Sequence, residues 1–494
     1  MSFRKKIMDK YNAIPVSARA SLWFLFANIF QKAIMVVFTP LFTRILTTEE
    51  FSRYAVFQSW ETILTVFATL NISNYATSKG LVEYKDDRNV FISSAQSLTV
   101  TLTIFTFGIF ILIRPVFTEL SEFPLWMMAL LFFDVISVAF FAFWSQLERF
   151  NQKYKMLTFV SVAMGMASPI SAFLLIIFAD EINMYKGWAR ILGLVISNGL
   201  VALLIFVISC NRSKVFFTTK YWKFCIVYCI PLIPHFLSTA FLQKIGQLFV
   251  DEYCGSDMSG IYALANSLAM LMMVVNDALT KTLVPWTYEK LSDKKYKDIN
   301  KPIVLSLALI AVIDIAMALA APELVAIFAD STYAKAVYAI PPLVAVCFFG
   351  FLYNTFANIE YYYKETKMVS MASAIAGVVI VAANMLLVPR FGFIAAAYSS
   401  LISYVVYSIM HYLFMRITLK KHLDGLEVYN NKLIFRMAVG FVSVILFVNV
   451  LYQFTILRYA VIMLSAIIVI IKRKYVINVI SNLFIKKEKK NVEQ

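Results

Sequence analysis

The chain has 494 residues, of which 61% are hydrophobic and only 15% are charged, and its mean hydropathy is +0.75. A soluble globular protein is nearer half apolar and a quarter charged, so this composition excludes an ordinary soluble fold. The apolar residues form long unbroken runs and not the alternation of a transmembrane barrel, which indicates an all-α polytopic membrane protein. The net charge of +16 fits the basic cytoplasmic loops of such proteins, and no basic patch is large enough for a nucleic-acid groove.

The first 19 residues form a short basic segment ahead of the first apolar run. That run is longer than the apolar core of a signal peptide, and no small-residue cleavage site follows it. We therefore expect a retained first helix, preceded by a cytoplasmic segment 1–19 that lies on the membrane surface.

Apolar runs bounded by charged or turn residues predict about fourteen membrane-spanning helices. We expect them at roughly 20–43, 51–75, 89–113, 123–146, 155–178, 187–209, 221–246, 258–283, 301–321, 336–359, 367–388, 391–415, 433–453 and 456–472. With the N-terminus in the cytoplasm, about 35 of the 45 lysines and arginines fall in cytoplasmic loops. This bias predicts that both termini are cytoplasmic and that 473–494 is a basic cytoplasmic tail.

Two pairs of segments indicate an internal repeat. TEEFSRYAV (48–56) aligns with SDMSGIYAL (256–264), and GWARILGLVIS (187–197) aligns with GFIAAAYSSLI (392–402). The similar offsets predict two six-helix lobes in the same orientation, 20–210 and 221–415, followed by two extra helices within 433–472. Parallel repeats of this kind are typical of transporters whose substrate site lies between the halves, although chance similarity between apolar segments is the alternative.

Two stretches carry a family resemblance. Residues 39–60, TPLFTRILTTEEFSRYAVFQSW, are similar to the first loop of the polysaccharide repeat-unit flippases, and residues 230–271 are similar to their seventh and eighth helices. These proteins export lipid-linked oligosaccharides for O-antigen and capsule synthesis, within the multidrug/oligosaccharidyl-lipid/polysaccharide exporter superfamily. The resemblance implies two six-helix lobes around a central cavity that opens to alternate sides. The chain departs from the family at Gly246-Gln247, where many relatives have an Asp-Arg pair, and nearby Lys244 is a candidate for the cationic role.

Polar side chains recur at helical spacing on the first, second, seventh and eighth spans, which occupy equivalent places in the two halves. A helix that is apolar except for one polar stripe is expected to line an aqueous cavity. The candidate cavity residues that would bind the substrate are Asn28, Gln31, Lys32, Gln58, His235, Gln243, Lys244 and Asn266.

Lys32 lies in the middle of the first apolar run, where an unpaired charge is costly. One interpretation is that its ammonium group contacts the pyrophosphate of a lipid-linked substrate, since lysine is a common point-charge partner for phosphate. The alternatives are a structural ion pair with Glu61 or another acid, and an extended side chain that reaches the membrane surface.

Acidic residues within or near the apolar runs are candidates for ion coupling, because a buried carboxyl group can take up a proton. They are Glu61, Asp134, Asp277 and Asp314. Interhelical hydrogen bonding is the structural alternative for each, and Asp277 could pair with Lys281 one turn later. Prolines in or beside the four polar helices predict kinks that are either hinges or static bends, at Pro40, Pro231, Pro234 and Pro285.

Metal binding is not expected. The five cysteines include no CxxC pair, Cys225 and Cys229 have the spacing of packing residues on one helix, and the three histidines are scattered.

The sequence as a whole predicts a flippase in the bacterial inner membrane, and not an enzyme. It would move undecaprenyl-pyrophosphate-linked oligosaccharide repeat units for O-antigen, capsule or exopolysaccharide synthesis. We expect no cofactor, coupling to H⁺ or Na⁺, and membrane lipids, a glycan polymerase and the chain-length machinery as partners. The alternatives are a flippase for a peptidoglycan precursor, a multidrug/cation antiporter, and a polytopic glycan polymerase or ligase, for which the external loops are short.

Overall fold

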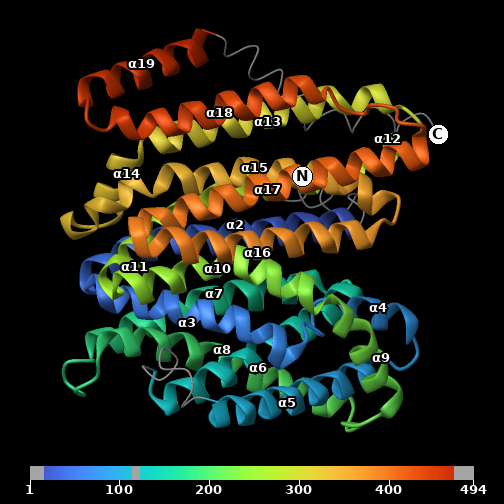
Figure 1. The fold of residues 1–494 in the computed structure, drawn as a ribbon. Coiled ribbons are helices and arrows are strands. Elements are labelled where there is room, and N and C mark those ends of the chain that lie inside the picture. The colour runs from blue at the N-terminus through green and yellow to red at the C-terminus, as the bar shows by residue number, and fades with distance from the viewer. Residues whose placement is uncertain (1–15, 114–122, 472–494) are drawn as a thin grey trace, which may run out of the picture. The chain divides into compact units, whose positions relative to one another are not determined.

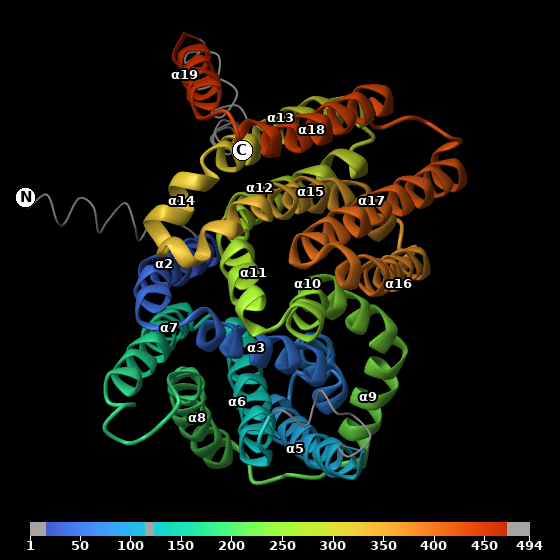
Figure 2. The ribbon, with the colours of Figure 1, turned by 60° about the vertical axis from the view of Figure 1, so that its left-hand side comes forward.

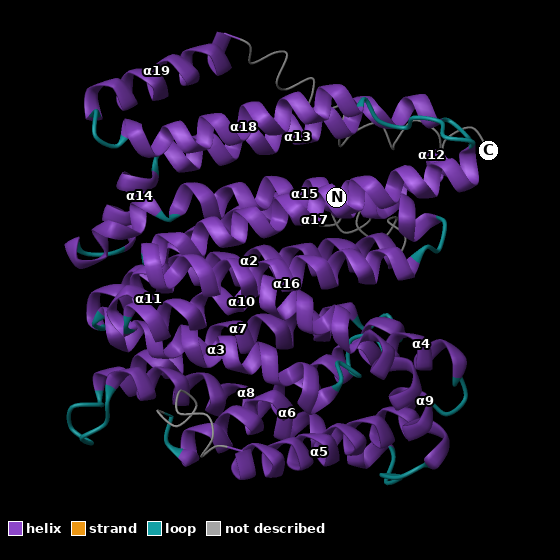
Figure 3. Cartoon of the chain, viewed as in Figure 1, coloured by secondary structure: helices purple, strands orange, loops and turns teal. Residues whose placement is uncertain are grey.

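The computed structural model describes residues 16–113 and 123–471, except for some side chains of the first and last helices. The described residues form helices joined by loops and turns, without a strand among them (Figure 3). The chain divides into two compact units, residues 1–260 and 261–494. Most of the basic segment 1–19 and the tail 473–494 lie outside the described residues.

Unit 1 is a bundle in which α3, α5, α6 and α8 pack side by side (Figures 1 and 2). Its elements are α2 (Val16–Ile45), α3 (Thr48–Thr69), α4 (Ala76–Glu83), α5 (Arg88–Ile113), α6 (Leu125–Phe150), α7 (Tyr154–Ile177), α8 (Lys186–Arg212), α9 (Thr219–Cys229), the 3₁₀ turn η3 (Ile230–Leu232), α10 (Ile233–Cys254) and the start of α11 (Ser256–Ala269).

The limits of α3 follow from local sequence. The Thr47 hydroxyl accepts a hydrogen bond from the Glu50 backbone N–H at 3.2 Å, and the Glu50 carboxylate accepts one from the Thr47 N–H at 2.9 Å. This reciprocal cap satisfies two backbone donors that a helix start leaves unpaired. At the other end, Leu70 takes the left-handed conformation and stops the helix.

Apolar side chains hold the bundle together where α3, α6 and α8 meet. Phe57, Met127 and Ile191 are fully buried in one cluster with their neighbours. The outward faces of the same unit are also apolar, with Leu112 and Phe159 exposed by 79% and 74%. Large exposed apolar side chains on long helices are expected where the solvent is lipid and not water.

Unit 2 contains the remaining helices. They are the rest of α11, the 3₁₀ turn η4 (Met270–Met272), α12 (Met273–Ser292), α13 (Tyr296–Leu319), α14 (Ala321–Phe328), η5 (Ser331–Tyr338), α15 (Ile340–Tyr362), α16 (Thr366–Phe391), α17 (Phe393–Leu423), α18 (Asn431–Leu451) and α19 (Thr455–Ile471). α15 packs against α12, α13, α16, α17 and α18, and is the most enclosed of the long apolar helices in the described chain.

Each of the fourteen predicted spans corresponds to a helix or a pair of stacked helices, and eleven of the described helices are long and apolar enough to cross a membrane. The count of fourteen is therefore not confirmed. α3 is not among the eleven because its polar residues lower its hydropathy, and α19 has only 17 described residues. The structure does not describe all side chains of α2, so whether α2 crosses the membrane stays a prediction.

The predicted seventh and eighth spans are broken helices. The 3₁₀ turn η3 contains Pro231 and α10 has Pro234 in its first turn, whereas η4 interrupts the eighth span without a proline. Pro40 and Pro285 lie inside α2 and α12. The short helix α4 lies between two predicted spans, whereas α14 and η5 lie mostly in the connection between the predicted spans 301–321 and 336–359 and overlap their ends.

The division between the units falls after α10, whereas the repeat predicted a boundary before it. α10 packs closely against α3, and the side chains of Ile63, Val66, Phe236 and Ala240 form a buried cluster between them. The lobe limits 20–210 and 221–415 and the C-terminal pair in 433–472 remain predictions.

Candidate functional site

One face of α3 carries a row of polar side chains into unit 1. Tyr54, Gln58 and Glu61 succeed one another at intervals of four and three residues, and all three are half-buried. The Gln58 amide donates a hydrogen bond to the Tyr54 hydroxyl at 3.0 Å. Thr62 and Thr65 donate to the carbonyl oxygens of their own helix four residues earlier, so their hydroxyl protons are not available to a ligand.

Glu61 interacts electrostatically with Asp134 of α6 and Lys244 of α10. Asp134 is fully buried, and its Oδ1 accepts a hydrogen bond from the Asn198 amide at 2.9 Å. Its other oxygen, Oδ2, accepts none from the described residues. Two carboxyl groups and one ammonium group thus share the interior of unit 1, and they come from helices far apart in the sequence.

Arg190 of α8 supplies a second cation beside this group. Its guanidinium carbon lies 4.0 Å from the centre of the Tyr54 ring, 4.4 Å from Phe51 and 4.6 Å from Phe42. Tyr54 interacts electrostatically with Arg190, Glu61 and Asp134, and Glu61 interacts with Lys244, so Tyr54 and Glu61 together connect the two cations. Aromatic faces stabilise a guanidinium group in a low-dielectric setting.

We call Tyr54, Gln58, Glu61, Asp134, Arg190, Asn198 and Lys244 the unit 1 charge cluster. Its two carboxyl groups and two cations balance when all are ionised, which is the condition under which charges are tolerated away from water. Protonation of one carboxyl group, or entry of a small cation, would leave an excess of positive charge. Ion coupling through these carboxyl groups stays a prediction.

Lys32 lies outside this cluster. It is half-buried on α2, and no residue in the described part of the chain forms an ion pair or hydrogen bond with it. A Lys32–Glu61 pair is not made in this structure, in which Glu61 interacts with Lys244. Neighbouring Gln31 donates to the backbone carbonyl of Ser161 at 3.0 Å, so it ties α2 to α7. The side chain of Asn28 is not among those that the structure describes.

The polar residues of α10 differ in their surroundings. His235 is half-buried beside Phe236, with ring centroids 5.9 Å apart, and Gln243 is exposed. Gln247 is buried and donates to the hydroxyl and carbonyl oxygens of Ser259, at 2.6 and 2.9 Å. Gln247 therefore has a structural role between α10 and α11.

The remaining predicted residues belong to unit 2. Asn266 is half-buried, whereas Asp314 is 1% exposed and accepts a hydrogen bond from the Phe348 backbone. Asp277 and Lys281 are both exposed and form no ion pair in the described structure, so the pairing considered for them is not made. Asp277 belongs to unit 2 and the other three residues to unit 1, so a cavity shared by Lys32, Glu61, Gln243 and Asp277 stays a prediction.

A buried acid–histidine pair in unit 2 was not predicted from the sequence. His411 Nδ1 lies 2.8 Å from Glu360 Oε1, and both side chains are fully buried between α17 and α15. Tyr353 stacks on the His411 ring at 5.6 Å. An acid at the end of one apolar run and a histidine inside another were the available signals, but nothing in the sequence joined them.

The cysteines Cys225 and Cys229 lie buried in a cluster with Ala76, Leu81 and Tyr221. Within the described residues there is no group of three histidine, cysteine or acidic side chains placed to hold a metal ion.

The two segments aligned as an internal repeat meet in unit 1, at the starts of α3 and α11. The Thr48 hydroxyl donates to the Asp257 carboxylate, and Ser52 donates to Asp251 at 3.1 Å and to Ser259 at 2.7 Å. A Cβ on Gly260 would lie 2.0 Å from the Thr48 carbonyl oxygen, so only glycine permits this approach. Contact between equivalent elements is expected near the axis of a duplicated fold.

Comparisons with known proteins agree with this architecture. A membrane protein of Haemophilus influenzae described as uncharacterized is 22% identical over 365 residues, which cover 72% of this chain and 86% of that protein. A second protein of that organism, described by its place in the Lsg locus, is 22% identical over 200 residues, or 39% of this chain and 50% of its own length.

Solved structures show the same fold at low identity. The lipid II flippase MurJ, in an inward closed conformation, superposes with a TM-score of 0.66 at 13% identity and covers 92% of this chain and 100% of its own. An inward-facing MATE multidrug resistance transporter of the MOP superfamily superposes with a TM-score of 0.60 at 12% identity, covering 79% and 96%.

The sequence family described as polysaccharide biosynthesis protein matches residues 17–291. This range contains every member of the unit 1 charge cluster and more than half of the chain. The chain is thus a multi-pass membrane protein with the fold of the MOP-superfamily transporters, and it belongs to the polysaccharide biosynthesis protein family.

Proposed function

We propose that this protein is a flippase that moves undecaprenyl-pyrophosphate-linked oligosaccharide repeat units from the cytoplasmic to the outer leaflet of the bacterial inner membrane. Transport would proceed by alternating access, without covalent chemistry. The product would serve O-antigen, capsule or exopolysaccharide synthesis, and a glycan polymerase with its chain-length machinery would receive it. Both termini would be cytoplasmic.

The observation that carries the proposal is Lys32, a cation halfway along α2 without a counter-ion among the described residues. A charge at mid-depth of a bilayer is rare unless it faces a cavity, a partner or a substrate. The pyrophosphate of a lipid-linked glycan is a dense anion, and an ammonium group binds phosphate as a point charge. Membership of the polysaccharide biosynthesis family supports a glycan as the cargo.

The unit 1 charge cluster supplies the second part of the proposal, which is ion coupling. Glu61 interacts with both Asp134 and the Lys244 ammonium group, so uptake of H⁺ or Na⁺ at this pair of carboxyl groups would weaken the interaction of Glu61 with Lys244. A change in pairing between α3, α6 and α10 is a local event that could bias a two-state helix bundle.

The main alternative is a flippase for a peptidoglycan precursor, because MurJ, which shares the fold, is a lipid II flippase. A multidrug/cation antiporter is a second alternative of the same fold. A cavity for organic cations is expected to be acidic, and Lys32 and Lys244 argue against it. A glycan polymerase or ligase would need catalytic groups on an external loop.

Transport by the purified chain in proteoliposomes tests the proposal. A lipid-linked oligosaccharide repeat unit and a lipid-linked peptidoglycan precursor are supplied separately, and movement is followed by accessibility of the glycan to an enzyme outside the vesicle. We expect movement of the repeat unit only. Movement of the peptidoglycan precursor alone would establish the alternative cargo.

Substitutions of Lys32 test its role in the same assay. Lys32→Arg keeps the positive charge and should retain transport, whereas Lys32→Ala should weaken cargo binding by roughly a hundredfold, because loss of one partner of a desolvated charge contact costs a few kcal/mol. Lys297→Ala, at an exposed lysine in the first turn of α13, is the matched control and should be silent. Recovery of transport in Lys32→Ala with Glu61→Ala would show that the lysine only neutralises an acid.

A further inference from the structure

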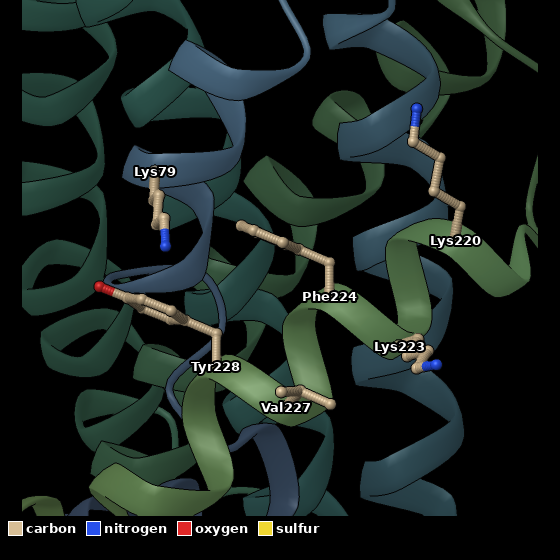
Figure 4. A pocket seen from close by; sticks show the side chains of 6 residues that line it. All are labelled: Lys79, Lys220, Lys223, Phe224, Val227 and Tyr228. Carbon is tan, nitrogen blue, oxygen red and sulfur yellow. The ribbon is translucent and has the colours of Figure 1, made fainter.

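A pocket of about 440 Å³ lies between α4 and α9 in unit 1, and its lining includes no member of the unit 1 charge cluster (Figure 4). Three lysines, two aromatic residues and one valine line it: Lys79, Lys220, Lys223, Phe224, Val227 and Tyr228. None of the residues to which we assign cargo binding or ion coupling lines it.

The lining of the pocket is one face of a helix. Lys220, Lys223, Phe224, Val227 and Tyr228 recur at helical intervals of three and four along α9. Lys79 comes from α4, which lies against α9 at the same end of unit 1 (Figure 1). α4 reaches this position because Gly80 has no side chain, since a Cβ there would lie 2.1 Å from the ring of buried Phe91.

The three ammonium groups are not neutralised by the protein. No carboxylate in the described parts of the chain forms an ion pair with Lys79, Lys220 or Lys223. The nearby acid Asp87 accepts a hydrogen bond from the Tyr221 hydroxyl at 3.2 Å. An excess of positive charge around a hollow favours an anion.

Aromatic rings hold two of the lysines in place. Lys79 Nζ lies 4.9 Å from the ring centre of Tyr228 and 5.9 Å from that of Phe224 (Figure 4). Lys220 Nζ lies 4.7 Å from the ring of Tyr84. A cation that rests on a ring remains able to bind an anion from its open side, so these two contacts leave Lys79 and Lys220 available to a ligand.

The surroundings of the pocket are apolar and exposed. Phe217, Val227 and Ile230 are exposed by 62%, 63% and 51%. Lys220 and Lys223 stand at the beginning of the long apolar stretch Thr219–Cys254, which is longer than a bilayer core requires. Lysines beside exposed apolar residues at a helix end are placed at the level of lipid head groups.

We propose that this pocket binds the phosphate of an anionic phospholipid, with an acyl chain along the exposed apolar side of α9. Lys79 would contact the phosphate beside the rings of Phe224 and Tyr228, and the flexible side chains of Lys220 and Lys223, whose ammonium groups lie apart from it in Figure 4, would turn toward the same anion. Val227 and Tyr228 would contact the glycerol and upper acyl carbons. A lipid-linked glycan is a poorer fit, because the lining offers no amide or carboxylate side chain for sugar hydroxyls.

Thermal unfolding of the full chain in a neutral detergent, titrated with phosphatidylglycerol, tests this site. A ligand that binds only the native state raises the melting temperature with its concentration, so the titration gives an apparent dissociation constant. We expect a saturable rise with phosphatidylglycerol and none with phosphatidylcholine. Replacement of all three pocket lysines by glutamine should raise that constant about a hundredfold, at roughly fivefold for each lysine.

A matched control separates the pocket from net charge. Lys294→Gln, Lys297→Gln and Lys301→Gln together remove the same charge from exposed positions, the first between α12 and α13 and the other two on α13. This variant should change the dissociation constant by less than about threefold. Arginine at the three pocket positions keeps the charge and should retain binding. This variant and single glutamine changes keep the test decisive if the triple glutamine chain does not fold.

Three results would overturn the assignment. Equal loss in the pocket and control variants would show diffuse attraction to the protein surface. An equal rise with inorganic phosphate would show that the lipid is not required. Loss of undecaprenyl diphosphate binding with phosphatidylglycerol binding intact would make the pocket a cargo site. The proposal does not depend on the cargo, because phosphatidylglycerol binding is measured without transport.

Discussion

Arg458 and Glu323 form a two-pronged ion pair that joins α19 to α14 in unit 2. The two nitrogen–oxygen distances are 2.6 and 2.5 Å, and the Tyr459 hydroxyl donates to the same carboxylate at 2.6 Å. Arg458 is 4% exposed and also donates to the Leu319 carbonyl at 2.7 Å. The hydrogen bond from Arg458 lowers the pKa of Glu323 to about 2. A paired carboxylate of this kind stabilises the fold only while it is ionised.

The first prediction concerns the pH dependence of this pair. Because the pKa of Glu323 is depressed in the folded state, its contribution is complete above the ordinary value of about 4.5 and is lost as the pH falls towards 2. Glu323→Gln should therefore lower the melting temperature at pH 7, and the difference from the natural chain should shrink below pH 4.5. Thermal unfolding between pH 7 and pH 3 measures it.

The control for this prediction is an exposed ion pair of the same unit. Glu427 and Arg416 are 3.1 Å apart, but their side chains are 58% and 47% exposed. Exposed pairs contribute about 0–1 kcal/mol, so Glu427→Gln should leave the melting temperature nearly unchanged. A pH-independent effect of Glu323→Gln would show that the carboxylate charge is not what stabilises this junction.

Residue types and helical spacing were sufficient to select most of the charged members of the unit 1 charge cluster. Gln58 and Glu61 stand out because a polar stripe on an apolar helix is visible in the sequence. Asn198 could not be selected, because its partner Asp134 lies on another helix 64 positions away. The Glu360–His411 pair was missed for the same reason: pairing across helices is a property of packing and not of local spacing.

At the scale of elements, α7 and α8 pack so closely that their backbones nearly touch. A Cβ on Gly193 would lie 2.3 Å from the Cα and the backbone nitrogen of Ala172. Ser171 crosses the same interface and donates to the Gly193 carbonyl at 2.7 Å. Small residues permit such approaches in membrane helices, where van der Waals contact replaces the hydrophobic effect as the main attraction.

The second prediction follows from that contact. Gly193→Ala should force α7 and α8 apart and destabilise the chain by about 1–3 kcal/mol, a common cost of overpacking. Gly108→Ala is the matched control, since no heavy atom lies within 4 Å of the Cβ position there. Thermal unfolding in detergent compares the two variants. An equal effect of both changes would indicate that helix propensity, and not the close approach, controls stability.

The positions of the helices followed from apolar runs, but their internal breaks did so only in part. Pro231 marks the break at η3, because proline removes a backbone donor and bends the chain. The break at η4 lies in the sequence MLM, which has no local signal for one. The length of an apolar segment can be recognised from its residue types, whereas a helix break without a proline depends on how the neighbouring helices pack.

At the scale of the whole molecule, the duplication and the topology are separate questions. Contacts between the starts of α3 and α11 involve the segments that the sequence aligned, Thr48 with Asp257 and Ser52 with Ser259. Such contacts agree with a duplicated chain in the MOP fold. They do not say which end of each helix faces the cytoplasm, because that depends on charge relative to a membrane.

The third prediction uses natural cysteines to determine the topology. Cys210 lies near the end of α8 and Cys254 ends α10, and both are half-buried, whereas Cys225, Cys229 and Cys347 are buried. The distribution of lysine and arginine predicts that the 210–220 connection is cytoplasmic and that the 250–258 connection is outside. A variant that keeps only Cys254 should react with a membrane-impermeant maleimide in intact cells, and one that keeps only Cys210 should react after the membrane is opened.

A cysteine at position 297 extends this test to the most basic connection, 289–301. Lys297 is exposed in the structure, so labelling there reports the side of the membrane and not burial. In a chain without its natural cysteines, Lys297→Cys should be labelled only from the cytoplasm, like Cys210. Labelling of 297 and 254 from the same side would require a different number of spans between them. Because α11 and α12 are the helices that separate the two positions, that result would mean that this broken pair enters the bilayer and returns without crossing it.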